Sequence, residues 1–174
     1  MPSKKSSPSS PRRLQPKRAV PRDHKARGEW VELLFMTNVA RLGLKVAKIH
    51  GDSSPVDAFV YARSTFHRVQ VKSTLYECPS RPGYYVCHCI WGTPRNIWRY
   101  SREQIDFIAA YVVPEDIWFI IPVTELTATA IHLPGRESLA ASRWGRFFEA
   151  WHLLGAGQPG LTIQAAADLF VDPQ

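Results

Sequence analysis

Several kinds of segment are missing from this chain of 174 residues, and each absence excludes a class of protein. The longest apolar runs, such as 117–123, fall far short of the roughly 20 residues that a transmembrane helix needs. The chain also lacks the continuous apolar stretch near its start that a secretory signal would have. A glycine-rich phosphate loop, an H-x-x-x-H zinc spacing and a Ser/His/Asp arrangement are absent too. We therefore expect a cytoplasmic protein without membrane contact that is neither a protease nor a nucleotide kinase.

Cysteine is scarce and irregularly spaced. The chain has three cysteines, Cys78, Cys87 and Cys89, without a C-x-x-C spacing. The run Cys87-His88-Cys89 is short, and in a strand its two cysteines would face one side and His88 the other. No second half of a zinc site follows. We therefore expect free thiols in a reducing compartment rather than a metal centre.

Acidic residues are nearly absent from the first 27 residues, which hold nine Lys and Arg but one Asp, for a net charge of +8. Residues 28–174 hold 13 basic and 14 acidic residues, for a net charge of −1. The first segment is also rich in proline and serine, so we predict a disordered basic tail over 1–26. Two functions remain open for it, an arm that binds nucleic acid and a tail that only aids solubility. The basic residues that we expect to contact nucleic acid are Lys17, Arg18, Arg22 and Lys25.

The rest of the chain has the composition of a folded domain. Hydrophobic residues make up 45% of the chain and aromatic residues 11%, which is enough to build a core. Apolar spacing predicts a helix over 29–42, terminated by Gly43, and an amphipathic helix over 137–154. Between them we expect strands at 44–49, 57–62, 66–73, 83–91, 106–113 and 117–123, with 93–100 irregular.

This order of elements indicates an α/β fold in which helices flank a mixed β-sheet. The last two strands are nearly continuous apolar runs, which is typical of strands buried on both faces. After the tail we therefore expect a core over 27–126. A helical extension over 127–174 would pack on this core.

The polar residues of the predicted hairpin form a candidate site. Gln70 and Lys72 are two residues apart and share one face of their strand. Asp57 joins them if it pairs opposite Gln70, which leaves 62–65 as the loop, or opposite Lys72, which gives a two-residue turn. A register shifted by one residue would send Asp57 to the other face.

A carboxylate, an amide oxygen and a backbone carbonyl together make an oxygen-rich site for Mg²⁺. Such a metal can polarise a phosphodiester and activate water, and Lys72 beside it would offset the charge that develops in the transition state. The same alternation of polar and apolar residues is also typical of any half-exposed strand. Spacing alone leaves a nuclease site and an ordinary strand both open.

Three segments carry a family resemblance: Arg27-Gly-Glu-Trp-Val-Glu32 before the first helix, Gly51-Asp-Ser-Ser-Pro-Val-Asp57, and Arg68-Val-Gln-Val-Lys72-Ser. Over about 27–125 the chain resembles the PD-(D/E)XK nuclease superfamily, in particular the branch with group I intron-encoded homing endonucleases. Holliday-junction resolvases are a more distant likeness. The resemblance implies a restriction-endonuclease-like fold and DNA cleavage that depends on Mg²⁺, with Mn²⁺ as the alternative ion. It also implies a homodimer or homotetramer that reaches both strands.

The resemblance assigns roles to individual residues. Asp57 matches the metal-binding aspartate and Lys72 the catalytic lysine. Gln70 stands where most of the superfamily has an acid, a departure for which this branch is known. Glu32 matches the glutamate of the first helix, with Glu29 as the alternative. The implied catalytic residues are Glu32, Asp57, Gln70 and Lys72, of which the first three would bind the metal.

Three further residues are weaker candidates, because each is more often plain surface or core. Arg68 and Ser73 would contact DNA phosphates, and Tyr100 would line the cleft. A second interpretation of the whole chain also remains open. In it, the protein keeps the nuclease fold without activity and binds nucleic acid or serves in protein assembly.

Overall fold

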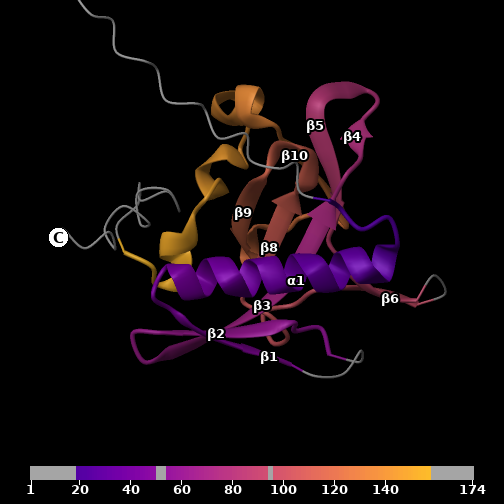
Figure 1. Cartoon of the computed structure of the whole chain (residues 1–174). Coiled ribbons are helices and arrows are strands. Elements are labelled where there is room, and N and C mark those ends of the chain that lie inside the picture. The colour runs from indigo at the N-terminus through magenta and orange to yellow at the C-terminus, as the bar shows by residue number, and fades with distance from the viewer. Residues whose placement is uncertain (1–18, 50–53, 94–95, 158–174) are drawn as a thin grey trace, which may run out of the picture.

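The computed structural model describes residues 19–49, 54–93 and 96–157, and its centre is a five-stranded mixed sheet (Figure 1). The strands lie in the order β1 (Lys45–Lys48), β2 (Ala58–Ala62), β3 (Thr65–Thr74), β8 (Phe107–Val112) and β9 (Ile117–Pro122). The neighbours β3 and β8 run parallel, and the other three neighbouring pairs run antiparallel. The apolar strands β8 and β9 are buried on both faces, as expected. The predicted mixed sheet is confirmed.

Helix α1 (His24–Arg41) covers one face of this sheet through the buried side chains Val31, Phe35 and Val39. The helix ends as predicted at Gly43, whose φ of 76° is the left-handed conformation that glycine adopts without strain. The N–H of Gly43 donates to Ala40 O at 3.0 Å, which satisfies a carbonyl of the last turn. The predicted helix is therefore present, but it begins at His24 rather than at residue 29.

The start of α1 corrects the predicted boundary of the tail. The carboxylate of Asp23 accepts a hydrogen bond from Ala26 N at 2.8 Å and so caps the helix. Residues 24–26 consequently belong to the helix and not to the tail over 1–26. Of the remaining tail, residues 19–23 are described and precede the helix, whereas 1–18 lie outside the described residues.

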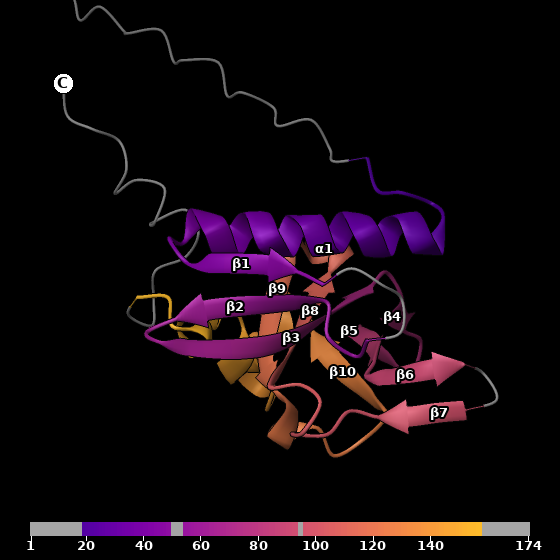
Figure 2. The ribbon, with the colours of Figure 1, turned by 90° about the horizontal axis from the view of Figure 1, so that it is seen from below.

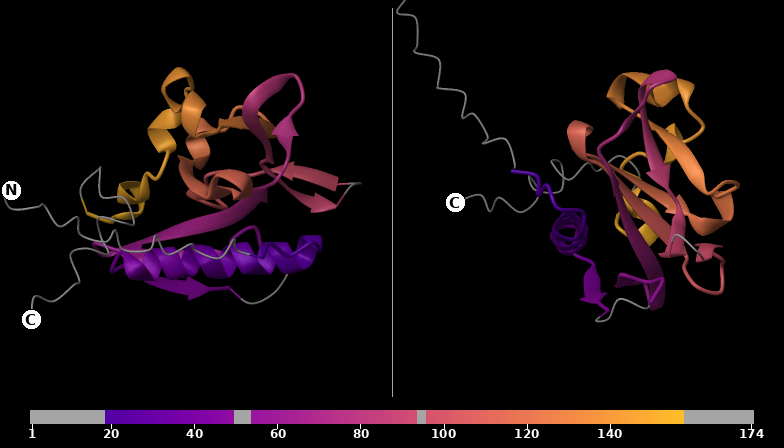
Figure 3. Two further views of the ribbon diagram at one scale, coloured as in Figure 1. Left: turned by 45° about the horizontal axis from the view of Figure 1, so that its top comes forward. Right: turned by 90° about the vertical axis from the view of Figure 1, so that its right-hand side faces the viewer.

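A second, three-stranded sheet covers the opposite face of the central sheet (Figure 3). Its strands are β4 (Glu77–Cys78), β5 (Arg81–His88) and β10 (Ala130–Pro134), in the order β10-β5-β4. Cys87 and Leu133 of this sheet pack against Ile108 and Phe119 of the central sheet. We expected helices on both faces, but α1 is the single α-helix of the described residues. All three cysteines are free and buried.

The segment that we expected to be irregular, 93–100, contains a strand. β7 (Asn96–Arg99) pairs antiparallel with β6 (Ile90–Thr93) to form a two-stranded ribbon. This pairing was missed because the residues of β7 are exposed and lack apolar alternation. The ribbon extends away from the two larger sheets (Figure 2).

The helix predicted over 137–154 is wrong. The chain instead forms the 3₁₀ turns η3 (Arg136–Ala141), η4 (Gly145–Phe147) and η5 (Trp151–Leu154). Two further 3₁₀ turns, η1 (Val113–Glu115) and η2 (Val123–Glu125), follow β8 and β9. The part of the predicted extension that is described, 127–157, thus consists of β10 and 3₁₀ turns, whereas 158–174 lies outside the described residues.

The aromatic residues of this segment explain why it is not a helix. Trp144 and Phe147 pack in the core between the two sheets, whereas Trp151 packs in the core beneath α1. The chain passes from one core to the other around the edge strand β9, where Glu149 N donates to Trp118 O at 2.9 Å. A straight helix would place these aromatic side chains on one face and could not fill both cores.

The hairpin of β2 and β3 has the first of the two predicted registers. Ala58 pairs with Val69, so Asp57, the next residue outward, comes opposite Gln70. The loop is shorter than expected, because Ala62 pairs with Thr65 and only Arg63 and Ser64 form the turn. Both turn residues have positive φ, 48° and 65°, as in the type I′ turns that suit the strand twist.

Candidate active site

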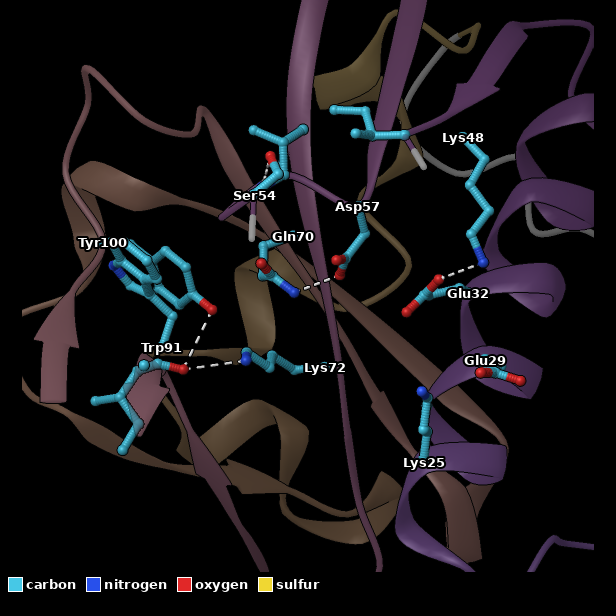
Figure 4. A pocket seen from close by; sticks show the side chains of 15 residues that line it. Lys25, Glu29, Glu32, Lys48, Ser54, Asp57, Gln70, Lys72, Trp91 and Tyr100 are labelled. Carbon is cyan, nitrogen blue, oxygen red and sulfur yellow. Dashed lines mark hydrogen bonds and ion pairs between the residues drawn. The ribbon is translucent and has the colours of Figure 1, made fainter. Parts of the chain in front are cut away.

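A cleft of about 660 Å³ opens beside the start of α1 and brings the predicted site residues together. Glu29 and Glu32 of α1 lie along one side of it (Figure 4). Trp91 and Tyr100 lie along the opposite side. The other residues that line it are Lys25, Gly28, Lys48, Ile49, Ser54, Val56, Asp57, Gln70, Lys72, Ile90 and Gly92. All four residues to which we assigned a catalytic role therefore face one cavity.

Asp57 is held by the strand next to it. Its Oδ2 accepts a hydrogen bond from Val71 N at 2.7 Å and another from Gln70 Nε2. The Gln70 side chain is only 7% exposed, and its Nε2 also donates to Val71 O at 3.2 Å. An amide carries an oxygen and a nitrogen on one carbon, so a half-turn of the Gln70 amide would present its oxygen at the same place.

Burial raises the pKa of Asp57 to about 6. The N–H of Val71 acts against this increase by stabilising the carboxylate, and the negative charge of Glu32 adds to it. The positive charges of Lys72 and Lys48 lower the pKa by smaller amounts. The site therefore holds a buried carboxylate whose charge is only partly compensated.

Lys72 points toward the opposite side of the cleft. Its Nζ donates to Ile90 O at 3.0 Å, and the Tyr100 hydroxyl donates to the same carbonyl at 3.2 Å. The ammonium also lies 5.4 Å from the centre of the Tyr100 ring. Burial, together with the charge of Asp57, raises the pKa of the Tyr100 hydroxyl. The backbone at Ile90 therefore positions both polar side chains, and Tyr100 lines the cleft as the sequence suggested.

Glu32 forms an ion pair that the sequence did not indicate. Its Oε2 lies 2.8 Å from Nζ of Lys48 on β1, and this hydrogen bond raises the pKa of Lys48. Both side chains are about a quarter to a third exposed, at 24% for Glu32 and 32% for Lys48. In sequence Lys48 is an ordinary polar residue of a short strand. Only the packing of α1 against β1 brings it to the cleft.

The PD-(D/E)XK endonuclease family model matches residues 22–154 of this chain. The chain belongs to the PD-(D/E)XK endonuclease family. The match begins at the start of α1 and extends through β10 and the 3₁₀ turns, so it includes most of what we expected to be a separate extension. The family resemblance seen in the sequence is confirmed.

The PD-(D/E)XK chain is also similar to solved structures, one of which shares its fold closely enough to support this membership. The bacterial homing endonuclease I-Ssp6803I is similar with a TM-score of 0.65 and 25% sequence identity, over 83% of this chain and 96% of that one. The Holliday junction resolvase Hjc of Archaeoglobus fulgidus gives a TM-score of 0.47 and 13% sequence identity, over 76% of this chain and 99% of that one. A search of curated proteins finds no match. The similarity to I-Ssp6803I confirms the restriction-endonuclease-like fold.

Two of the residues expected to contact DNA do not line the described cleft of this PD-(D/E)XK chain. Arg68 forms an ion pair of 2.8 Å with Asp106, whose Oδ2 also accepts from Arg68 N at 2.7 Å. Ser73 follows Lys72 in β3, so its side chain faces the other side of the sheet. Their proposed DNA contacts would have to lie outside the cleft.

The predicted tail contacts divide into two groups. Lys25 lies in the first turn of α1 and lines the cleft, and Arg22 is exposed just before the helix. Lys17 and Arg18 lie outside the described residues. Of these four residues, Lys25 is therefore the one that the structure places at the cleft of the PD-(D/E)XK fold.

The donors in the cleft fit a hard divalent cation. Asp57 and Glu32 supply carboxylates and Gln70 an amide oxygen, and all three line one cavity. Hard cations such as Mg²⁺ prefer oxygen ligands of these kinds. Within the described ranges, no group of three or more His, Cys, Asp or Glu is arranged to hold a metal. A metal held by these three residues would have the amide of Gln70 beside two carboxylates. The described residues also contain no helix long and apolar enough to span a membrane.

Proposed function

We propose that this chain is a metal-dependent DNA endonuclease that hydrolyses phosphodiester bonds in the cleft. The observation that supports this most directly is the register of the β2–β3 hairpin. It sets Asp57 opposite Gln70 and leaves Lys72 on the same face, within one cavity of about 660 Å³. Membership of the PD-(D/E)XK endonuclease family agrees with it.

Asp57, Gln70 and Glu32 are the proposed ligands of Mg²⁺, with Mn²⁺ as a substitute. The bound metal supplies polarisation of the phosphodiester and acidification of water. Burial raises the pKa of Asp57 to about 6, and a cation beside it would stabilise the ionised form that burial disfavours. Gln70 contributes an oxygen without charge, so the site carries less negative charge than one built from acids alone.

Lys72 is the proposed catalytic cation. The carbonyl of Ile90 holds its ammonium at 3.0 Å, so the charge is in place before DNA arrives. A preorganised cation beside the phosphate lowers the energy of a transition state in which negative charge accumulates. Tyr100 shares that carbonyl and limits where the ammonium can move.

The DNA would run past the start of α1, where Lys25 lines the cleft and Arg22 is exposed. Since the remainder of the chain carries a net charge of −1, the basic segment would supply much of the attraction to phosphates. We further propose that the protein forms a dimer or tetramer, because one cleft reaches one strand of the DNA. We also propose a cytoplasmic location.

A second candidate is an inactive protein of this fold that binds nucleic acid or assists assembly. The observation that favours it is the composition of the cleft. Gln70 replaces an acid, and Glu32 is already paired with Lys48 at 2.8 Å. If that pair persists, Asp57 is left as the principal anionic ligand.

Plasmid nicking separates the two candidates. Purified wild type, Asp57→Asn and Lys72→Ala would each be incubated with supercoiled DNA and Mg²⁺ or Mn²⁺, and DNA binding would be measured in parallel. Wild type should nick, and both variants should lose most of that activity while still binding DNA. Equal nicking by all three would refute the catalytic assignment. Binding without nicking by wild type, with intact, nicked and branched DNA, would favour the inactive candidate.

A further inference from the structure

The β6–β7 ribbon leaves the body of the protein directly beside the cleft. Ile90, Trp91 and Gly92 of β6 line the cleft, whereas every described residue of β7 is exposed. Among the described strands, β6 and β7 pair with each other and with no strand of the two larger sheets. The ribbon extends outward from the two larger sheets (Figures 1 and 2). Any polymer bound in the cleft would therefore lie next to the ribbon.

The ribbon holds a tryptophan in an exposed position. Trp98 is 56% exposed and pairs across the ribbon with Trp91, their ring centres 6.3 Å apart. Gly92 has a φ of 106°, and a Cβ on it would lie 2.9 Å from Cδ1 of Trp98 and 2.1 Å from Asn96 O. Glycine thus leaves the space that the Trp98 ring occupies. The indole of Trp98 therefore lies against the backbone of Gly92 while much of it stays exposed.

The chemistry of the ribbon suits nucleic acid better than a protein partner. The sequence from 90 to 102 contains no acidic residue, and Arg99 and Arg102 are both exposed. Aromatic faces among cations are the usual composition of surfaces that stack bases and contact phosphates.

We propose that Trp98 stacks on a base of the DNA bound in the cleft, and that the preferred substrate is duplex DNA with unpaired or unstacked bases beside the cleaved bond. In an intact duplex, neighbouring bases cover both faces of each base. An indole can stack only where a base has lost a neighbour, and such bases cost least to expose where pairing is already broken. The proposal rests on the endonuclease function proposed above and adds its substrate class.

Binding can be measured separately from cleavage. Two duplexes of one sequence, fully paired or with an unpaired 2-aminopurine, would be titrated without divalent metal, so that the DNA stays intact. Wild type should bind the unpaired duplex more tightly and quench its fluorescence. Trp98→Ala should abolish the quenching and weaken binding of the unpaired duplex about tenfold to a hundredfold, with little change for the paired one. Trp98→Phe should retain most of the effect, because it keeps an aromatic face.

Phe66→Ala is the matched control, since Phe66 is an aromatic residue of a strand, 66% exposed, that does not line the described cleft. It should behave as wild type. The proposal is overturned if wild type binds both duplexes equally or binds neither. It is also overturned if Trp98→Ala binds the two duplexes as wild type does. If light scattering gives Trp98→Ala a molar mass different from that of wild type, the proposal is also overturned. The ribbon would then be an interface between protein chains. Quenching that depends on Trp98 in a protein that cleaves no DNA would uphold the inference and refute the catalytic function.

Discussion

Asp57 and Gln70 face each other at the open end of the β2–β3 hairpin, and Gln70 Nε2 donates a hydrogen bond to Asp57 Oδ2. The same carboxylate oxygen accepts a hydrogen bond from Val71 N at 2.7 Å. The strand that carries Gln70 and Lys72 therefore also fixes the position of Asp57. The geometry of the cleft therefore depends on one carboxylate that burial makes harder to ionise.

Protonation of Asp57 should make stability depend on pH. Its folded pKa of about 6 lies above the ordinary 3.8, so the folded state favours the protonated form. The stability that this provides is fully present below about pH 4 and is lost as pH rises through 6. In EDTA, urea unfolding of wild type should lose about 1–3 kcal/mol relative to Asp57→Asn between pH 4 and 7. If the free energies of unfolding of the two proteins change in parallel with pH, the prediction is wrong and the pKa of Asp57 is not raised by folding.

Glu32 and Glu29 can be distinguished by metal binding. Both line the cleft, but Glu32 is fixed by Lys48 at 2.8 Å, whereas Glu29 is exposed. We expect Mg²⁺ to raise the Tm of wild type, because a ligand that binds the folded state stabilises it. Glu32→Gln should lose most of that increase and Glu29→Gln should keep it. The reverse result would transfer the metal-binding role to Glu29.

Lys48 should compete with the metal for Glu32. Removing its positive charge from the cleft leaves the carboxylate available to a cation, so Lys48→Met should bind Mg²⁺ several-fold more tightly in calorimetry. The ion pair is partly exposed, so the same substitution should change the free energy of unfolding by less than about 1 kcal/mol. Weaker Mg²⁺ binding would mean that Lys48 orients Glu32 for the metal instead of competing with it.

Gly145 tests the architecture of the C-terminal segment. In a helix over 137–154, Gly145→Ala would stabilise the protein by about 1 kcal/mol. In the observed turns, the new Cβ would lie 2.2 Å from the backbone oxygen of Leu139, so we expect a loss of roughly 1–3 kcal/mol in urea unfolding. Gly157→Ala is the control, because nothing lies within 4 Å of its Cβ position and no such clash arises.

The sequence alone was sufficient where local chemistry decides the structure. The left-handed turn at Gly43, the doubly buried strands β8 and β9, and the β2–β3 hairpin follow from neighbouring residues. The spacing of Gln70 and Lys72 places them on one face whatever the surrounding fold. The family resemblance also came from short segments that are continuous in the chain.

Only the tertiary structure decided the features that depend on distant segments. The spacing of Trp144, Phe147 and Trp151 fits one helical face, but two separate cores on opposite sides of the central sheet take up these side chains. The pairing of Lys48 with Glu32 requires the packing of α1 on β1, and the exposure of Trp98 requires the pairing of β6 with β7. Local periodicity does not specify such contacts, because each depends on which surface a remote part of the chain presents.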